Sequence, residues 1–436
     1  MTDVDEHASV RTAATRRDPR LQWLMASLLC LVALAVLGVE AYEFLIAPKI
    51  TNAPAVFSDL KIYRGAVDYW WHGGGLYNYA SDNPKAIGLG FTYPPFAATV
   101  FLPMLAMPQR GLEWVWTIGT FVVIVKLALS LRPDDWPVGD ERRSPANSPA
   151  RRVAHVALAA AMLGLSYPIF FNLILGQVSV FVIASAFLDV AAMTSPRWRG
   201  SLVGLAAAVK LTPLIFIPYF LVTRQWRATA IASVTSLSAG VVAFLISPGT
   251  SITYWTAEAI DTARMGQTWL PWNKSTLALI ARWHAGGAWQ GILWISLCLI
   301  LVVHGLLHAW RLYSEGDDVS AALLVGCTGV AVSPISWDHH QIWGVLVAVL
   351  LATSPRLRHR VVGAVLFVVF FIGLPLSGRT KWLEGPMPLT WRIAMEVPVA
   401  SFMTIVVLGL PPKRIPDVGA GPAPAVELMG SIRQAR

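Results

Sequence analysis

Charged side chains are scarce in this chain of 436 residues. Asp, Glu, Lys and Arg together make up 14% of it, whereas hydrophobic residues make up 55%. An average soluble domain is about a quarter charged, so too few charges are present to cover a water-soluble globule of this size. The apolar stretches recur along the whole chain, which excludes a single membrane anchor. The composition therefore predicts an all-α polytopic membrane protein.

Cysteine is also rare, and this limits the chemistry that the chain can support. The three cysteines, Cys30, Cys298 and Cys327, each lie inside an apolar run, and none has the CxxC spacing. This pattern excludes a disulfide framework and a cysteine metal cluster, so we interpret the three thiols as small core residues. No other part of the sequence requires a cofactor or a metal ion.

Basic residues exceed acidic ones, which gives a formal net charge of +9. Such an excess could indicate nucleic-acid binding. The Arg and Lys residues, however, lie mainly in short segments between apolar runs, which is the pattern that orients membrane proteins. We therefore expect membrane lipids, and no nucleic acid, as partners.

Hydropathy predicts one transmembrane domain over 21–410, without a short-period repeat. A basic cytoplasmic tail (1–20) precedes it, and a disordered cytoplasmic tail rich in Pro, Gly and Ala (411–436) follows it. About twelve crossings are expected, but simple alternation does not settle the topology of 94–222. The external loops are expected near 47–93, 247–287, 336–340 and 378–394.

Lys210 lies in the middle of the apolar run 200–222, three residues before Pro213. Because proline breaks a helix and broken helices occur where they line a cavity, we expect two half-helices that form a hairpin. A cation inside a membrane is costly and suggests a function. Lys210 could bind an anion such as phosphate, or it could snorkel or pair with a buried carboxylate.

The first external loop contains a helical pattern after Asp59. Leu60, Tyr63, Val67 and Trp70 recur at helical spacing, which predicts a short helix on the outer leaflet with Asp59 at its N-cap. Asp is a preferred cap residue. From position alone, capping is the favoured role of Asp59.

Two later segments could bind a substrate. Trp337-Asp-His-His340 forms a short turn between spans, and its imidazoles could donate hydrogen bonds to phosphate or sugar oxygens, or move protons. The alternative is that they are boundary residues. The loop Trp269–Ser275 combines aromatic rings with Asn273 and Lys274, a mixture found in sugar sites and also in ordinary interfacial loops.

The order of these motifs resembles a known family. The motifs are Asp59-Leu-x-x-Tyr63, Leu76-Tyr77, Phe91-Thr-Tyr-Pro-Pro-Phe96, Asn172, Gly176-Gln177, Gly204-Leu-Ala-Ala-Ala-Val-Lys-Leu-Thr-Pro213, Asn273-Lys-Ser275 and Ser333-Pro-Ile-Ser-Trp-Asp-His-His340. Over roughly 55–345 the chain resembles the polyprenyl-phosphate mannosyltransferases of glycosyltransferase family 87, which have the GT-C membrane fold. Within that family it looks most like the members that extend phosphatidylinositol mannosides.

The resemblance implies transfer of mannose from polyprenyl-phosphate mannose to a mannose hydroxyl of a phosphatidylinositol mannoside. The expected linkage is α-1,2, and the expected site is the periplasmic face of an actinobacterial plasma membrane. Asp59 matches the family's catalytic carboxylate, which replaces the capping interpretation by that of a general base. Related sequences often read Asn-Gln-Ser where this chain has Asn273-Lys-Ser275, so the role of that loop stays open.

The donor is a β-mannosyl phosphate and the product is α, which requires one inverting displacement. Preorganised cations would stabilise the leaving phosphate. The candidate substrate-binding residues are Lys210, His339, His340, Arg64, Tyr93, Gln177, Asn273, Lys274 and Trp337. The alternatives are a lipomannan or lipoarabinomannan mannosyltransferase of the same family and, in another class, a membrane transporter or lipid flippase.

Overall fold

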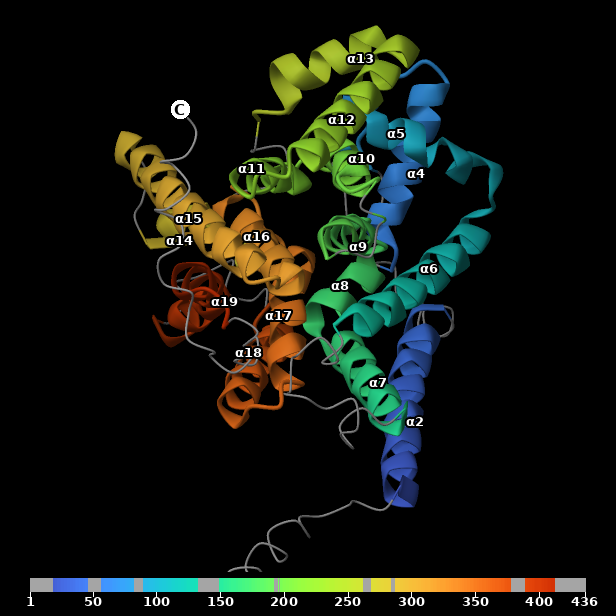
Figure 1. Cartoon of the computed structure of the whole chain (residues 1–436). Coiled ribbons are helices and arrows are strands. Elements are labelled where there is room, and N and C mark those ends of the chain that lie inside the picture. The colour runs from blue at the N-terminus through green and yellow to red at the C-terminus, as the bar shows by residue number, and fades with distance from the viewer. Residues whose placement is uncertain are drawn as a thin grey trace, which may run out of the picture.

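The computed structural model describes most of the chain. The described residues are 19–45, 56–81, 89–131, 149–191, 195, 197–261, 268–283, 287–377 and 389–411. Within these ranges the chain is helical and contains no strand (Figure 1). The all-α prediction is therefore confirmed for the described part. Nearly all of both expected tails, and most of the loop expected at 378–394, lie outside it.

The first long helices form one side of the bundle. They are α2 (Pro19–Leu45), α6 (Gln109–Ser130) and α7 (Pro149–Leu165), and the nine-residue α8 (Tyr167–Leu175) follows α7. Helix α2 packs along α7 (Figure 1). Helices α7 and α8 meet at an angle of 61°, because Ser166 is extended and Pro168 has no N–H to continue the helical bonding.

A hairpin follows α9 (Ser179–Val190). Its rising limb is α10 (Ser201–Val209), its returning limb is η5 (Thr212–Ile215) with α11 (Phe216–Val222), and α12 (Trp226–Ile246) follows. Arg199 donates a hydrogen bond of 3.0 Å to Gln225. The chain therefore returns at Gln225 to the level from which it rose, and the hairpin predicted from Pro213 is confirmed.

In the second half of the chain, a tight turn connects two buried helices, α16 (Asp318–Val332) and α17 (Ile342–Ala352). The long helices of this half are α15 (Ala288–Ser314), α18 (Leu357–Ser377) and α19 (Leu389–Leu408). Helices α16 and α17 run antiparallel at close range, since a Cβ added to Gly326 would lie 2.1 Å from the Trp343 ring. The short helix η8 (Asp338–Gln341) lies in the turn between them.

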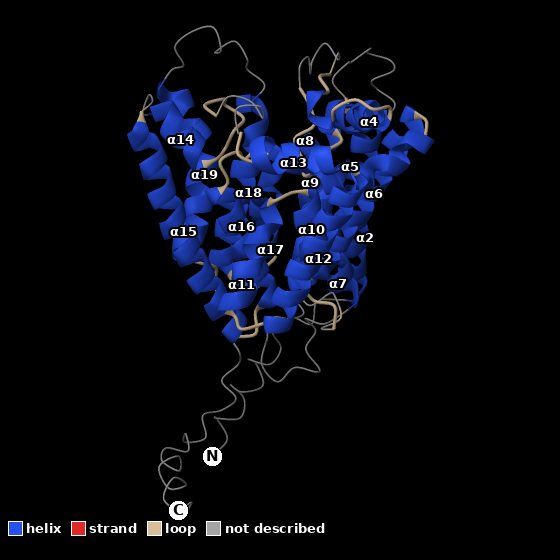
Figure 2. Cartoon of the chain, turned by 90° about the horizontal axis from the view of Figure 1, so that it is seen from above, coloured by secondary structure: helices blue, strands red, loops and turns tan. Residues whose placement is uncertain are grey.

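Short helices occupy one end of the bundle, which we call the site end. In Figure 2, α4 and α14 lie at this upper end and α11 lies at the lower end. The short helices at the site end are α4 (Ser58–Trp71), η1 (Leu76–Asn78), α5 (Pro95–Phe101), η2 (Leu102–Ala106), α13 (Pro248–Thr253), η6 (Tyr254–Glu258) and α14 (Thr276–Trp283).

Helix α4 has the predicted buried face of Leu60, Tyr63 and Val67, but Asp59 is not its N-cap. The N-cap is Phe57, which has a left-handed backbone conformation and makes no side-chain capping bond. The Phe57 N–H donates to the carbonyl of Ile174 at 2.7 Å. The start of α4 is thus anchored to α8 through the backbone, which leaves the carboxylate of Asp59 for other contacts.

Three of the described helices, α6, α12 and α15, are long and apolar enough to cross a membrane. The bent pair α7 and α8 would make a fourth span. Helices α16 and α17 have 15 and 11 residues, fewer than the roughly 20 of an ordinary span. The count of about twelve crossings stays a prediction, as does the side of the membrane that each end faces.

Candidate active site

Asp59 lies in the first turn of α4 and is only partly buried. Its carboxylate accepts hydrogen bonds from the Gln177 side-chain amide and from the Ser58 hydroxyl. Burial of the carboxyl raises its pKa to about 6, against the opposing effects of these two bonds and of the charge on Lys210. A carboxyl with this pKa is poised to exchange a proton near neutral pH.

Gln177 is held in place by the end of helix α8. Gly176 adopts a left-handed conformation with φ of 67°, and a Cβ there would lie 2.7 Å from the Cβ of Leu60. Only glycine therefore allows α4 to approach so closely. Asn172 fixes the backbone of Gln177, because its Nδ2 donates to the Gln177 carbonyl at 3.1 Å.

Two tyrosines extend this hydrogen-bonded group. The Tyr93 hydroxyl donates to Gln177 Oε1 at 3.0 Å, and the hydroxyls of Tyr63 and Tyr93 are 3.0 Å apart. Both rings are buried. Tyr93 precedes α5 and Tyr63 lies on α4, so Gln177 connects three segments that are distant in sequence.

Lys210 lies at the tip of the hairpin. Its Nζ donates to Ser179 Oγ at 2.8 Å, lies 2.7 Å from His340 Nε2 and lies 5.3 Å from the centre of the Tyr93 ring. Among the described residues, Lys210 forms no ion pair with a carboxylate. The expected alternative of a direct buried pair is therefore not what the structure contains.

A cavity opens beside Lys210. Its polar part is lined by Ser179, Lys210, Ser336 and His340, and its apolar part includes Phe216 and Trp343. Asp59 does not line this cavity. It is connected to it through Gln177, because Ser179 Oγ donates to Gln177 Oε1 at 3.3 Å.

The turn Trp337–His340 directs its two imidazoles differently. His340 faces Lys210, whereas the His339 ring stacks on Phe171 with the ring centres 6.2 Å apart. His339 and Asp338 are each 2% exposed, yet both ring nitrogens of His339 and one carboxylate oxygen of Asp338 have no hydrogen-bond partner. Burial lowers the pKa of His339, which keeps the ring neutral, and raises that of Asp338 to about 6.

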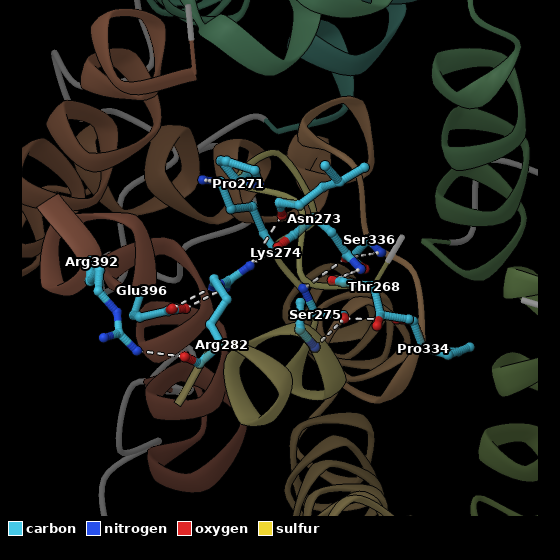
Figure 3. Close-up of polar contacts among 12 residues, drawn as sticks. Thr268, Pro271, Asn273, Lys274, Ser275, Arg282, Pro334, Ser336, Arg392 and Glu396 are labelled. Carbon is cyan, nitrogen blue, oxygen red and sulfur yellow. Dashed lines mark hydrogen bonds and ion pairs between the residues drawn. The ribbon is translucent and has the colours of Figure 1, made fainter. Parts of the chain in front are cut away.

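The loop around Asn273 joins this turn through hydrogen bonds (Figure 3). Asn273 Oδ1 accepts from the backbone N–H groups of Ser275 and Ser336 at 3.2 and 2.9 Å. Its Nδ2 donates to the Thr268 carbonyl at 3.0 Å, and the Lys274 N–H donates to the Ser336 carbonyl at 2.7 Å. These bonds use both ends of the Asn273 amide to fix the loop against the turn.

Of the candidates from the sequence, Asp59, Tyr93, Gln177, Lys210 and His340 form one connected group. The others lie elsewhere. Arg64 donates to Gln109 at 3.4 Å, Lys274 Nζ donates to the Pro271 carbonyl at 2.6 Å, and the Trp337 backbone pairs with that of Asn273.

Three neighbours were not selected from the sequence, although each lies in or next to a selected motif. Tyr63 ends the motif Asp-Leu-x-x-Tyr, Ser179 follows Gln177 by two residues, and Asp338 lies inside Trp-Asp-His-His. Closeness to these motifs was the only signal that could have found them. Among the described residues, no group of three His, Cys, Asp or Glu side chains could hold a metal ion.

Comparison with known proteins places this site in context. The model of the family described as Glycosyltransferase family 87 matches residues 91–334, which is more than half of the chain. The match begins after Asp59 and ends before the turn Trp337–His340. No solved structure matches the chain.

Three relatives cover most of the chain. One, from Mycolicibacterium smegmatis, is named a polyprenol-phosphate-mannose-dependent alpha-(1-2)-phosphatidylinositol pentamannoside mannosyltransferase; it is 32% identical over 86% of each chain. A protein of the same name from Mycobacterium tuberculosis is 30% identical over 92% of this chain and 91% of its own. Another from M. smegmatis, named as acting on a phosphatidylinositol mannoside, is 29% identical over 76% of each chain.

Proposed function

This chain belongs to glycosyltransferase family 87, and we propose that it transfers mannose from polyprenyl-phosphate mannose to a mannose hydroxyl of a phosphatidylinositol mannoside. The product has an α-1,2 linkage. The observation that carries the proposal is one connected group of side chains. Gln177 links the Asp59 carboxylate to the Ser179 hydroxyl, and Ser179 in turn accepts a hydrogen bond from Lys210 Nζ. This arrangement sets a base beside a cationic site.

Lys210 and His340 are proposed to bind the donor phosphate. His340 Nδ1 accepts the Trp337 N–H at 3.2 Å, so the proton of the neutral ring lies on Nε2 and faces Lys210. His340 Nε2 and Lys210 Nζ lie 2.7 Å apart, so without a ligand the imidazole N–H donates to an unprotonated Lys210 amine. With a phosphate oxygen bound between them, a protonated Lys210 and the imidazole N–H would both donate to that oxygen. Both also stabilise the charge that the phosphate gains as the glycosidic bond breaks.

Asp59 is proposed to act as the general base. As the acceptor oxygen bonds to the anomeric carbon from the face opposite the phosphate, the hydroxyl proton passes to Asp59 and polyprenyl phosphate leaves. The β-linked donor thereby gives an α-linked product in one inverting displacement. The pKa of about 6 keeps most of the carboxylate ionised at pH 7 while it retains affinity for a proton.

His339 and Asp338 have hydrogen-bonding capacity that the protein does not use. The unpartnered ring nitrogens and carboxylate oxygen are complementary to sugar hydroxyls, which both donate and accept. A buried polar group without a partner costs free energy, so a bound sugar would relieve this cost. We assign these two residues to the carbohydrate and Lys210 with His340 to the phosphate.

The proposed acceptor is a phosphatidylinositol mannoside. Relatives named for a phosphatidylinositol mannoside and for a phosphatidylinositol pentamannoside are 29% and 32% identical to this chain, so identity favours neither. A lipomannan acceptor is the nearest rival. We place the reaction on the periplasmic side of an actinobacterial plasma membrane, without a metal cofactor.

The test is to incubate the purified full chain in nanodiscs with radiolabelled polyprenyl-phosphate mannose and a panel of phosphatidylinositol mannosides. We expect a labelled glycolipid whose new mannose is released by an α-1,2-specific mannosidase. The proposal is wrong if no acceptor gains mannose. Movement of intact donor across sealed vesicles, without a new glycosidic bond, would instead indicate a transporter.

A further inference from the structure

A buried ion pair links the last helix to the site end. Arg282 of α14 donates from Nε and Nη2 to the two carboxylate oxygens of Glu396 on α19, at 2.6 and 2.5 Å (Figure 3). The two side chains are 7% and 10% exposed. Such a two-bond pair fixes orientation as well as distance, because both groups are planar.

Arg282 also reaches the loop before α14. Its Nη1 donates to the carbonyls of Leu270 and Asn273 at 3.2 and 2.9 Å. Three nitrogens of one guanidinium therefore connect α19 to the backbone of the Asn273 loop. Helix α19 approaches a second time, since Arg392 donates to the Arg282 carbonyl at 2.5 Å and lies 4.6 Å over the Trp283 ring.

The same loop is bonded to the segment that carries the histidines. Asn273 Oδ1 accepts from the Ser336 N–H, and Ser275 Oγ donates to the Pro334 carbonyl at 2.8 Å. Residue 336 is followed at once by the turn Trp337–His340. A path of hydrogen bonds thus runs from Glu396 through Arg282 and Asn273 to Ser336, which lies four residues before His340.

We propose that Arg282 and Glu396 are positioning residues that set where His340 stands relative to Lys210. Buried ion pairs are weak devices for stability, because desolvation offsets much of their attraction, but their directional bonds can hold a loop in one place. His340 Nε2 lies only 2.7 Å from Lys210 Nζ, so a displacement of 1 Å would separate the two groups that face the phosphate.

Glu396, unlike Arg282, lies outside the part of the chain that the family model matches. That match ends at residue 334, whereas Glu396 and Arg392 belong to α19. Neither residue touches the group formed by Asp59, Gln177 and Lys210. Their influence on the reaction would pass only through the loop and the turn.

The experiment rests on the proposed transfer of mannose and uses the full chain in nanodiscs with labelled polyprenyl-phosphate mannose. Glu396→Gln keeps the shape of the side chain and removes its charge. We expect kcat/KM for the donor to fall about tenfold, with KM for the acceptor unchanged. Asp318→Asn breaks another ion pair, Arg199–Asp318 at 3.1 Å, at the lower end of the bundle, and serves as the matched control without effect on transfer.

A double-mutant cycle separates positioning from a general loss of structure. If Glu396 acts through His340, then Glu396→Gln adds less than a twofold loss in a His340→Ala background. A tenfold loss in that background as well would mean that the ion pair acts elsewhere, and the inference would be discarded. So would wild-type donor kinetics for Glu396→Gln.

A milder variant covers the case in which Glu396→Gln does not fold. Ser275→Ala removes the bond from the Ser275 hydroxyl to the Pro334 carbonyl, together with the bond that this hydroxyl accepts from the Ala278 N–H at the start of α14. It leaves the side chains of Arg282 and Glu396 unchanged. It should lower donor kcat/KM about threefold, again only when His340 is present; an unchanged value overturns the path. If the wild-type chain forms no glycosidic bond at all, the proposed function fails before this comparison begins.

Discussion

Two carboxylates, the partly buried Asp59 and the fully buried Asp189, show how a reactive group differs from a structural one. Asp189 is fully buried and accepts the backbone N–H groups of Gly200 and Val203 at 2.9–3.0 Å. It closes the N-terminus of α10, where the helix dipole also favours a negative charge. Asp59 receives its two hydrogen bonds from the side chains of Gln177 and Ser58.

The difference teaches that free hydrogen-bonding capacity, rather than burial alone, distinguishes the residues of the site. Backbone donors have fixed positions, so the Asp189 carboxylate is committed to holding the chain. The donors around Asp59 are side chains on rotatable bonds, and part of its surface is open. The same contrast separates His340, which has partners on both nitrogens, from His339, which has none.

The largest expected effect is that of Asp59→Asn. Removal of a general base costs about 10²–10⁴ in rate, so we expect transfer to fall about a thousandfold while donor binding is retained. The measurement is initial rate and donor affinity of the purified variant in nanodiscs. Wild-type turnover would show that another group accepts the proton.

Lys210→Met should have the next largest effect. A hydrogen bond to a charged group contributes about 1.5–3 kcal/mol, so kcat/KM for the donor should fall about tenfold to a hundredfold. KM for the acceptor should stay near the wild-type value. Titration with polyprenyl-phosphate mannose at fixed acceptor concentration measures this, and unchanged donor kinetics would remove Lys210 from the phosphate site.

Asp189→Asn should have the opposite profile to Asp59→Asn. The variant leaves part of the N-terminus of α10 without its acceptor, and we expect a loss of about 1–3 kcal/mol in stability. Activity per folded molecule should not change. Thermal unfolding in detergent and rate per folded enzyme measure the two quantities, and a catalytic loss without a stability loss would contradict the comparison.

The pH dependence of transfer sharpens the comparison further. Since the base acts as carboxylate, kcat/KM should fall about tenfold for each pH unit below the Asp59 pKa of about 6. Burial gives Asp338 a pKa of about 6 as well, so Asp338→Asn is the necessary control. That variant should retain the decline in kcat/KM at low pH. If the decline disappeared in Asp338→Asn, it would be assigned to Asp338.

The same pKa predicts a small effect on stability. The folded carboxyl of Asp59 binds its proton more tightly than the unfolded one, whose pKa is 3.8. Its contribution to stability is therefore greatest at acid pH and decreases as the pH rises to about 6. Above pH 6, Asp59→Asn should unfold at a slightly higher temperature than the wild-type chain, and the difference should shrink on acidification.

Local patterns in the sequence were enough to predict several features. The apolar composition predicted a helical membrane protein, the spacing of Leu60, Tyr63 and Val67 predicted α4, and Pro213 predicted the hairpin that carries Lys210. Each of these depends on residues that are neighbours along the chain. Their periodicity or backbone chemistry acts over one or two helical turns.

Contacts between distant segments needed the tertiary structure. Asp59 and Gln177 are 118 positions apart, and Arg282 and Glu396 are 114 apart, so no local pattern announces either pair. From the sequence, Arg64, Asn273 and Lys274 are candidates for the substrate, and only the packing reveals Gln109, Ser336 and Pro271 as their protein partners. A side chain's residue type determines which bonds it can form; which partner it meets depends on how the helices pack.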